Sequence, residues 1–121
     1  MTDKKILGAK GENLAAKFLE QKGYKIIDRN YQAKNFGEID IIAEQEGQII
    51  FIEVKTKTQY QFGLPEEALT KVKKNKLNRA INFYLNQRHY PIDFTGWRLE
   101  LVAIDLFPNQ LPKIYHYDDL S

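Results

Sequence analysis

The sequence contains no cysteine, only two histidines and a single tryptophan among its 121 residues. The absence of cysteine excludes disulfides, thiolate-bound zinc and thiol nucleophiles, and it suits a reducing compartment. Neither His89 nor His116 has a second histidine at ligand spacing, which favours a surface or packing role for both. Any metal site must therefore be built mainly from carboxylates.

Long apolar runs are also missing. No stretch approaches the roughly 20 apolar residues of a membrane-spanning helix, and residues 1–8 are basic without the apolar segment of a secretion signal. The sequence therefore predicts a soluble, cytoplasmic protein with no membrane partner. A chain of 121 residues without repeats, low-complexity tracts or linkers predicts a single domain over residues 1–121.

Two strand-like apolar runs interrupted by charge are the most informative part of the chain. They cover residues 37–43 and 49–55, and Glu46-Gly47 between them predicts a tight turn and an antiparallel hairpin. If Gln45 faces Gln48, Asp40 lies opposite Glu53. Opposed residues have Cβ atoms about 4.5–5.5 Å apart, and like charges there are destabilising. A compensating charge is therefore expected beside the two carboxylates.

Side chains alternate along a strand, so the hairpin is predicted to have one charged and one apolar face. The charged face would carry Glu38, Asp40, Glu53 and Lys55. The apolar face would carry Ile39, Ile41, Ala43, Ile50, Ile52 and Val54. Lys55 is one candidate for neutralising the acids, and Mg²⁺, which binds one or two carboxylates with waters and substrate phosphates, is another. The alternative is a set of ordinary solvated charges on the open face of a sheet.

Periodicity and turn residues predict the remaining elements. The expected order is α-β-β-β-α-β with an optional edge strand. The expected ranges are a helix at 4–22, strands at 24–31, 37–43 and 49–55, a helix at 65–86, a strand at 97–106 and the edge strand at 113–117. Polar connectors are expected at 32–36 and 56–62.

Glu12 is unusual for its position in the first predicted helix. It shares a helical stripe with Gly8, Ala15, Ala16 and Leu19, which predicts that it is partly buried. An unpaired buried charge is costly. Glu12 should therefore reach solvent, a cation, or a metal site formed with Asp40 and Glu53.

Positive charge is concentrated in the second predicted helix, although the net charge is only +2. Residues 71–79 include five basic residues and no acidic one. A basic helix beside an acidic pocket suits a phosphate-rich ligand bound through metal. The alternative is that these side chains only solvate one face of the helix.

The combination of Glu12, Glu38-Ile39-Asp40 and Glu53-Val54-Lys55, in this order, resembles the PD-(D/E)xK nuclease superfamily. The chain more closely resembles the YraN-like bacterial family, which is related to archaeal Holliday junction resolvases. The segments that carry this resemblance are residues 8–16, 29–31, 37–43, 51–57, 62–63 and 68–70. An E-x-K motif alone has little specificity, whereas the ordered combination is specific.

The resemblance implies an α/β fold with a restriction-endonuclease-like αβββαβ core, in which helices flank a mixed sheet. It implies that Asp40, Glu53 and the Val54 carbonyl bind Mg²⁺ or Mn²⁺. Glu12 would act directly or through water, and Lys55 would lie beside the attacking water. The implied catalytic residues are thus Glu12, Asp40, Glu53 and Lys55.

The resemblance also assigns basic residues to nucleic-acid binding. Lys73 matches the basic residue of a fourth motif and would hold a phosphate, unless it is only a lysine at the margin of the core. Lys57, Lys74 and Lys76 are the other expected nucleic-acid contacts. The chain departs from the family pattern in three places, with Ile39 for a proline, Lys57 for an arginine and Lys71 for a proline. Replacing arginine by Lys57 weakens any bidentate phosphate contact.

The expected function is Mg²⁺- or Mn²⁺-dependent hydrolysis of phosphodiester bonds in nucleic acid, with DNA, including branched DNA, as the expected partner. Two alternatives stay open: a nucleic-acid-binding module that does not cleave, and a protein-interaction domain. A homodimer would suit symmetric junction cleavage. The aromatic residues available for such an interface, or for the core, are Phe94, Trp97, Tyr115 and Tyr117.

Overall fold

The computed structural model describes residues 3–58, 70–118 and 120. The elements in this part of the chain are α1 (Asp3–Gln21), β1 (Lys25–Gln32), the short 3-10 helix η1 (Lys34–Phe36), β2 (Glu38–Gln45), β3 (Gln48–Lys57), α2 (Lys71–Gln87), β4 (Trp97–Asp105) and β5 (Lys113–Tyr117). The predicted order of helices and strands is confirmed, and the optional edge strand is present as β5.

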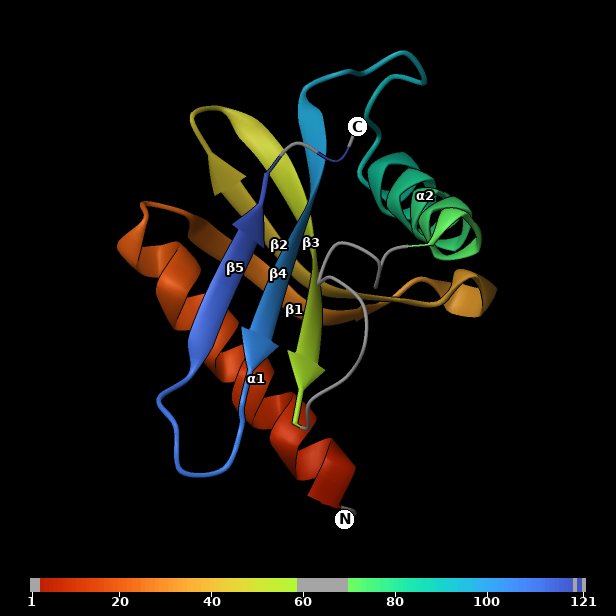
Figure 1. Ribbon diagram of the computed structural model, residues 1–121. Coiled ribbons are helices and arrows are strands. Elements are labelled where there is room, and N and C mark those ends of the chain that lie inside the picture. Colours follow the sequence, from red (N-terminus) through yellow and green to blue (C-terminus); the bar gives the residue numbers. More distant parts are fainter. Residues whose placement is uncertain (1–2, 59–69, 119, 121) are drawn as a thin grey trace.

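The five strands form one sheet in the order β1-β2-β3-β4-β5. Neighbouring strands are antiparallel except β3 and β4, which are parallel and are joined through the crossover that contains α2. Figure 1 shows α1 against one face of the sheet and α2 against the other. The fold is therefore the predicted α/β class, and the mixed sheet between two helices matches a restriction-endonuclease-like core.

Each face of the sheet has its own hydrophobic core. Beneath α1 the core is formed by Ala15, Leu19, Ile41, Ile50, Ile52, Val102 and Ile104, with smaller neighbours. Beneath α2 it is formed by Ile39, Ile42, Phe51, Leu77, Ile81, Tyr84 and Leu99. Each helix is buried along one stripe of residues only. Neither described helix is long and apolar enough to cross a membrane.

The structure corrects three expectations about these elements. The second helix begins at Lys71 and not at residue 65. Thr70 is extended, and its Oγ1 caps the helix by accepting from the Lys73 N–H at 3.2 Å. Residues 65–69 lie outside the described part of the chain. The third strand continues through Thr56 and Lys57, since β4 supplies pairing partners as far as Asp105. Ile39 packs beneath α2 and not α1. Its partner on β1 is Tyr31, and the preceding Asn30 has a left-handed φ of 54°, which interrupts the regular alternation of this strand pair.

A buried carboxylate on the α1 side joins distant parts of the chain. Glu100 is fully buried, accepts from Tyr24 Oη at 2.8 Å and Arg98 Nε at 3.0 Å, and lies 2.7 Å from His116 Nε2. Burial alone would raise the pKa of Glu100, but the hydrogen bonds from His116, Tyr24 and Arg98 outweigh it and lower the pKa. His116 thus has the packing role expected from the sequence, while His89 is exposed.

Candidate functional site

The hairpin of β2 and β3 ends its backbone pairing just before the two predicted metal ligands. The register is the expected one, from Gln45 opposite Gln48 to Ile41 opposite Ile52. Beyond that pair, the Val54 N–H donates to the Asp40 carboxylate (Oδ2) at 2.8 Å and not to a β2 carbonyl. The Asp40 side chain therefore closes the end of the hairpin beside Glu53.

Asp40 and Glu53 form an acidic pair at the end of the hairpin, and the charge of Glu53 acts on Asp40. Burial, and after it the Glu53 charge, raise the pKa of Asp40 to about 8, although the hydrogen bond from the Val54 N–H opposes the rise. Glu53 is itself buried, with 9% of its surface exposed. Without a bound metal ion, Asp40 consequently keeps its proton at neutral pH, as expected for two acids held together in a poorly solvated place.

Lys73 of α2 supplies the positive charge nearest to Glu53. Its Nζ lies 3.1 Å from Glu53 Oε1, and 39% of the lysine side chain is exposed. The lysine end of this ion pair is open to solvent, whereas Glu53 is buried and is costly to leave without a cation. The ammonium can therefore leave Glu53 for another anion once a different cation neutralises that carboxylate.

Glu12 of α1 is partly buried, as predicted, and its cation is Arg29 of β1. Arg29 Nη2 and Nε lie 3.0 and 3.2 Å from Glu12 Oε1, and Nη2 also donates to Asn13 Oδ1 at 2.7 Å. Glu12 is close enough to Asp40 for its charge to contribute to the raised pKa of that residue. The structure thus brings Glu12 to the acidic pair but holds it with an arginine.

Close packing of α1 on β3 sets the position of Glu12. A Cβ atom on Gly11 would lie 2.0 Å from Thr56 Oγ1 and 3.0 Å from Thr56 Cβ, so only glycine fits between the helix and the strand. The neighbouring Glu12 is therefore held close to the end of the hairpin where Asp40 and Glu53 lie.

A small cavity of about 220 Å³ opens onto the acidic pair. Its wall consists of Phe36, Gly37, Glu38, Asp40, Glu53, Lys73, Lys76 and Leu77. Gly37 adopts φ 103°, and a Cβ there would lie 3.1 Å from Lys76 Cε, so the lysine stem runs directly across this glycine. Two predicted phosphate-binding lysines, Lys73 and Lys76, thus border the carboxylates.

The other predicted basic residues lie farther away. Lys55 shares the strand face of Glu53 by alternation and is partly exposed, but it does not line the cavity. Lys57 lies at the end of β3 opposite Asp105, and Lys74 faces a larger groove on α2. Within the described residues, no group of three or more acidic, histidine or cysteine side chains is placed to hold one metal ion.

Sequence reasoning missed Arg29 and the η1 turn that carries Phe36. Arg29 belongs to one of the motif segments, but a motif position does not reveal that its guanidinium pairs with Glu12, 17 residues earlier. The sequence predicts Phe36 in the loop before the hairpin, and only the fold brings it to the cavity wall. The partial burial of Glu12, which calls for a cation on a neighbouring strand, is the signal in the sequence that points toward Arg29.

Comparison with known proteins shows the family of the chain. Residues 11–104 match the model of "Uncharacterised protein family UPF0102". A UPF0102 protein of Syntrophomonas wolfei is 45% identical over 110 residues, covering 91% of this chain and 92% of the relative. Another, of Caldanaerobacter subterraneus, is 39% identical over 119 residues, covering 94% and 93%. The YraN-like resemblance is thereby confirmed, and the chain belongs to the UPF0102 family.

Proposed function

We propose that this protein is a divalent-metal-dependent nuclease whose metal is held by Asp40 and Glu53. The observation that carries the proposal is the placement of Asp40 beside the buried Glu53 at the open end of the hairpin, where burial and the Glu53 charge raise the pKa of Asp40. Two acids held together so unfavourably gain most from a bound cation, and Mg²⁺ sites use one or two carboxylates with waters and substrate phosphates. The donor set therefore fits Mg²⁺ or Mn²⁺.

The Val54 carbonyl is the third proposed protein ligand. A strand residue directs its N–H and its carbonyl to the same edge, and the Val54 N–H points to Asp40. Since pairing with β2 has ended before this residue, its carbonyl faces the same open end of the hairpin. When bound, a divalent ion would lower the pKa of a water molecule and polarise a phosphoryl oxygen.

The chain's own side chains supply the remaining parts of the proposed mechanism. Lys73 exchanges Glu53 for a substrate phosphate once a different cation neutralises that carboxylate. Lys76, beside Gly37, holds a neighbouring phosphate. Lys55, on the strand face of Glu53, adds positive charge where negative charge develops, and Glu12, fixed by Arg29, orients water from the α1 side.

A nucleic-acid-binding module without cleavage is the second candidate, and a specific observation favours it. Both Glu53 and Glu12 already have a protein cation, Lys73 and Arg29. A site neutralised by its own lysine and arginine can persist without metal, while α2 still attracts phosphates through its basic residues.

The decisive experiment is a cleavage assay with Mn²⁺ on labelled four-way junction, flap, duplex and single-stranded DNA, and on RNA. The variants are Asp40→Asn and Lys55→Ala, and the matched controls are Glu44→Gln and Lys17→Ala, which are exposed. We expect cleavage by the unmodified protein and both controls, and a loss of about 100-fold or more in each site variant.

Calorimetric titration with Mn²⁺ separates the two candidates. The nuclease proposal requires Mn²⁺ binding that Asp40→Asn abolishes. Cleavage that persists equally in both site variants would indicate a contaminating enzyme, and absence of Mn²⁺ binding would leave only the binding module.

A further inference from the structure

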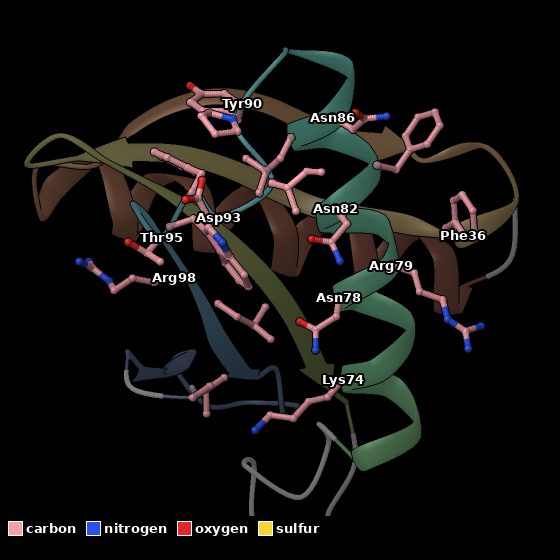
Figure 2. A pocket seen from close by; sticks show the side chains of 18 residues that line it. Phe36, Lys74, Asn78, Arg79, Asn82, Asn86, Tyr90, Asp93, Thr95 and Arg98 are labelled. Carbon is pink, nitrogen blue, oxygen red and sulfur yellow. The ribbon is translucent and has the colours of Figure 1, made fainter.

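A second and larger hollow lies along α2, separate from the acidic cavity. This groove, about 1080 Å³ in volume, is bounded by α2 on one side and by the segment from Tyr90 to Leu99 on the other. Figure 2 shows the helix with side chains of the groove on both of its flanks. None of the residues proposed above to hold metal lines it.

A polar stripe on α2 faces this groove. Lys74, Asn78 and Asn82 are spaced four residues apart and therefore lie on one helical face. Figure 2 shows all three leaving the helix on the side of Asp93 and Thr95, whereas Arg79 leaves on the opposite side. Asn78 and Asn82 are exposed, and their amides offer both donors and acceptors to a ligand.

Aromatic side chains form the opposite part of the groove. Tyr90 and Phe94 lie with ring centroids 4.6 Å apart, and Trp97, which is partly buried, contacts the core through Phe51 at a centroid distance of 5.8 Å. All three line the groove. Rings anchored in a core but open on one side are the surfaces on which unpaired bases stack.

The charge of α2 complements a polyanion. The helix contains five basic residues and no acidic one. Lys74 follows directly after Lys73, which contacts Glu53, and Phe36 lines both the groove and the acidic cavity. The groove and the cavity at the candidate metal site are thus separate but adjoin at Phe36.

We propose that the α2 groove binds an unpaired strand of nucleic acid, with bases against Trp97 and its neighbouring rings, base edges at Asn78 and Asn82, and a phosphate at Lys74. This inference rests on the proposed nuclease function and specifies its substrate class. A duplex hides the faces of its bases, so it cannot use the rings, and asparagine amides recognise base edges by paired hydrogen bonds. The substrate is therefore a single strand, or a single-stranded region next to a duplex.

Trp97 allows a direct test because it is the only tryptophan of the chain. A 20-nucleotide single strand is titrated into the protein in EDTA, which separates binding from cleavage, while Trp97 emission and the anisotropy of a dye on the oligonucleotide are recorded. The same sequence annealed to its complement is the comparison. We expect saturable quenching by the single strand, and at least tenfold weaker binding of the duplex.

Substitutions in the polar stripe test the proposed contacts to base edges, and a substitution outside the groove is the matched control. Asn78→Ala combined with Asn82→Ala is expected to weaken single-strand binding about tenfold. Asn75→Ala, an exposed asparagine of the same helix outside the groove, should bind like the unmodified protein. All these positions are exposed, so urea unfolding should show equal stability for the three proteins.

Several results would overturn the inference. They are equal affinity for the duplex, unchanged affinity in the Asn78→Ala, Asn82→Ala protein, or strand binding without any change in Trp97 emission. A titrated peptide or protein that quenches Trp97 where the oligonucleotide does not would assign the groove to a protein partner. Strand binding retained without Mn²⁺-dependent cleavage would refute the nuclease proposal alone. Cleavage that the Asn78→Ala, Asn82→Ala protein retains in full would refute only the proposed role of the groove.

Discussion

At the scale of single residues, Asp40 is an acid held where its charge is unfavourable. Its pKa is raised to about 8 by burial and by the Glu53 charge. The folded protein therefore binds this proton more tightly than the unfolded chain does. The contribution to stability is complete at low pH and is lost as the pH rises toward 8 in metal-free protein.

Asp40→Asn should remove this loss. An asparagine can still accept from the Val54 N–H but never ionises, so the variant is expected to become more stable than the unmodified protein as the pH rises from 5 to 8.5, by at least about 1 kcal/mol at pH 8. Thermal unfolding in EDTA across this range measures the difference. Glu44→Gln, an exposed carboxylate of the same strand, is the control, and a difference that does not change with pH would contradict the prediction.

Lys73→Met separates two roles of this lysine. Without the ammonium near Glu53, Mn²⁺ is expected to bind about three- to tenfold more tightly, because a positive charge next to its ligand has been removed. Cleavage should nevertheless fall, since the phosphate loses its lysine. Calorimetry and the cleavage assay measure the two effects, with Lys71→Met, exposed on the same helix, as control. Weaker Mn²⁺ binding in Lys73→Met would refute the expected competition between the Lys73 ammonium and Mn²⁺ for Glu53.

The sequence predicted part of this residue-scale arrangement. The turn register placed Asp40 opposite Glu53, and the helical stripe predicted that Glu12 is partly buried. The counter-ions could not be predicted, because Arg29 and Lys73 reach these acids only when helices and strands pack, and the spacing of residues in the sequence does not set that distance.

At the scale of elements, the two helices pack differently on the sheet. Gly11 lets α1 come into direct contact with Thr56 of β3, while α2 leaves a wide groove along its flank. The expected helix start was wrong because Thr70 caps α2, a role that a threonine shows only through its extended backbone and its hydrogen bond. The strand β3 extended further than predicted because its ending depends on β4, more than 40 residues later.

Gly11→Ala tests the close packing of α1. The added methyl group would overlap Thr56 Oγ1, and overpacking of this kind costs about 1–3 kcal/mol. Adding Thr56→Ala should restore part of the loss, since it removes the closest contact and leaves only the Cβ at 3.0 Å. Urea unfolding of the single and double variants measures the coupling, and purely additive effects would show that the two residues do not collide.

At the scale of the whole molecule, the partly buried Asp40 and the fully buried Glu100 respond to pH in opposite directions. The pKa of Asp40 is raised, whereas hydrogen bonds lower the pKa of Glu100. The stability that Glu100 provides is present above its unfolded pKa and is lost as the pH falls through its folded pKa. Glu100 connects residues as far apart as Tyr24 and His116, and for this reason no local sequence pattern could predict the cluster.

Glu100→Gln should therefore lower the free energy of unfolding most at neutral pH. Removing the charge leaves Arg98 without its anion and weakens the hydrogen bonds of Tyr24 and His116, and breaking a buried ion pair costs about 3–5 kcal/mol. Below pH 4.5 the deficit should shrink, because the unmodified protein loses the same contribution. Chemical unfolding at pH 7 and pH 4 measures both, and the exposed Glu20→Gln should change stability by less than about 0.5 kcal/mol. A deficit of equal size at both pH values would contradict this account.

The end of the hairpin has one more consequence. The Val54 amide proton is bonded to a carboxylate and not to a neighbouring strand, so its resonance in a ¹⁵N-labelled sample depends directly on the charge state of Asp40. Ionisation of that acid, or its capture by a cation, would move this one cross-peak before any other part of the sheet responds. A single backbone nucleus thus serves as a built-in indicator for the site, readable without substrate and without a substitution.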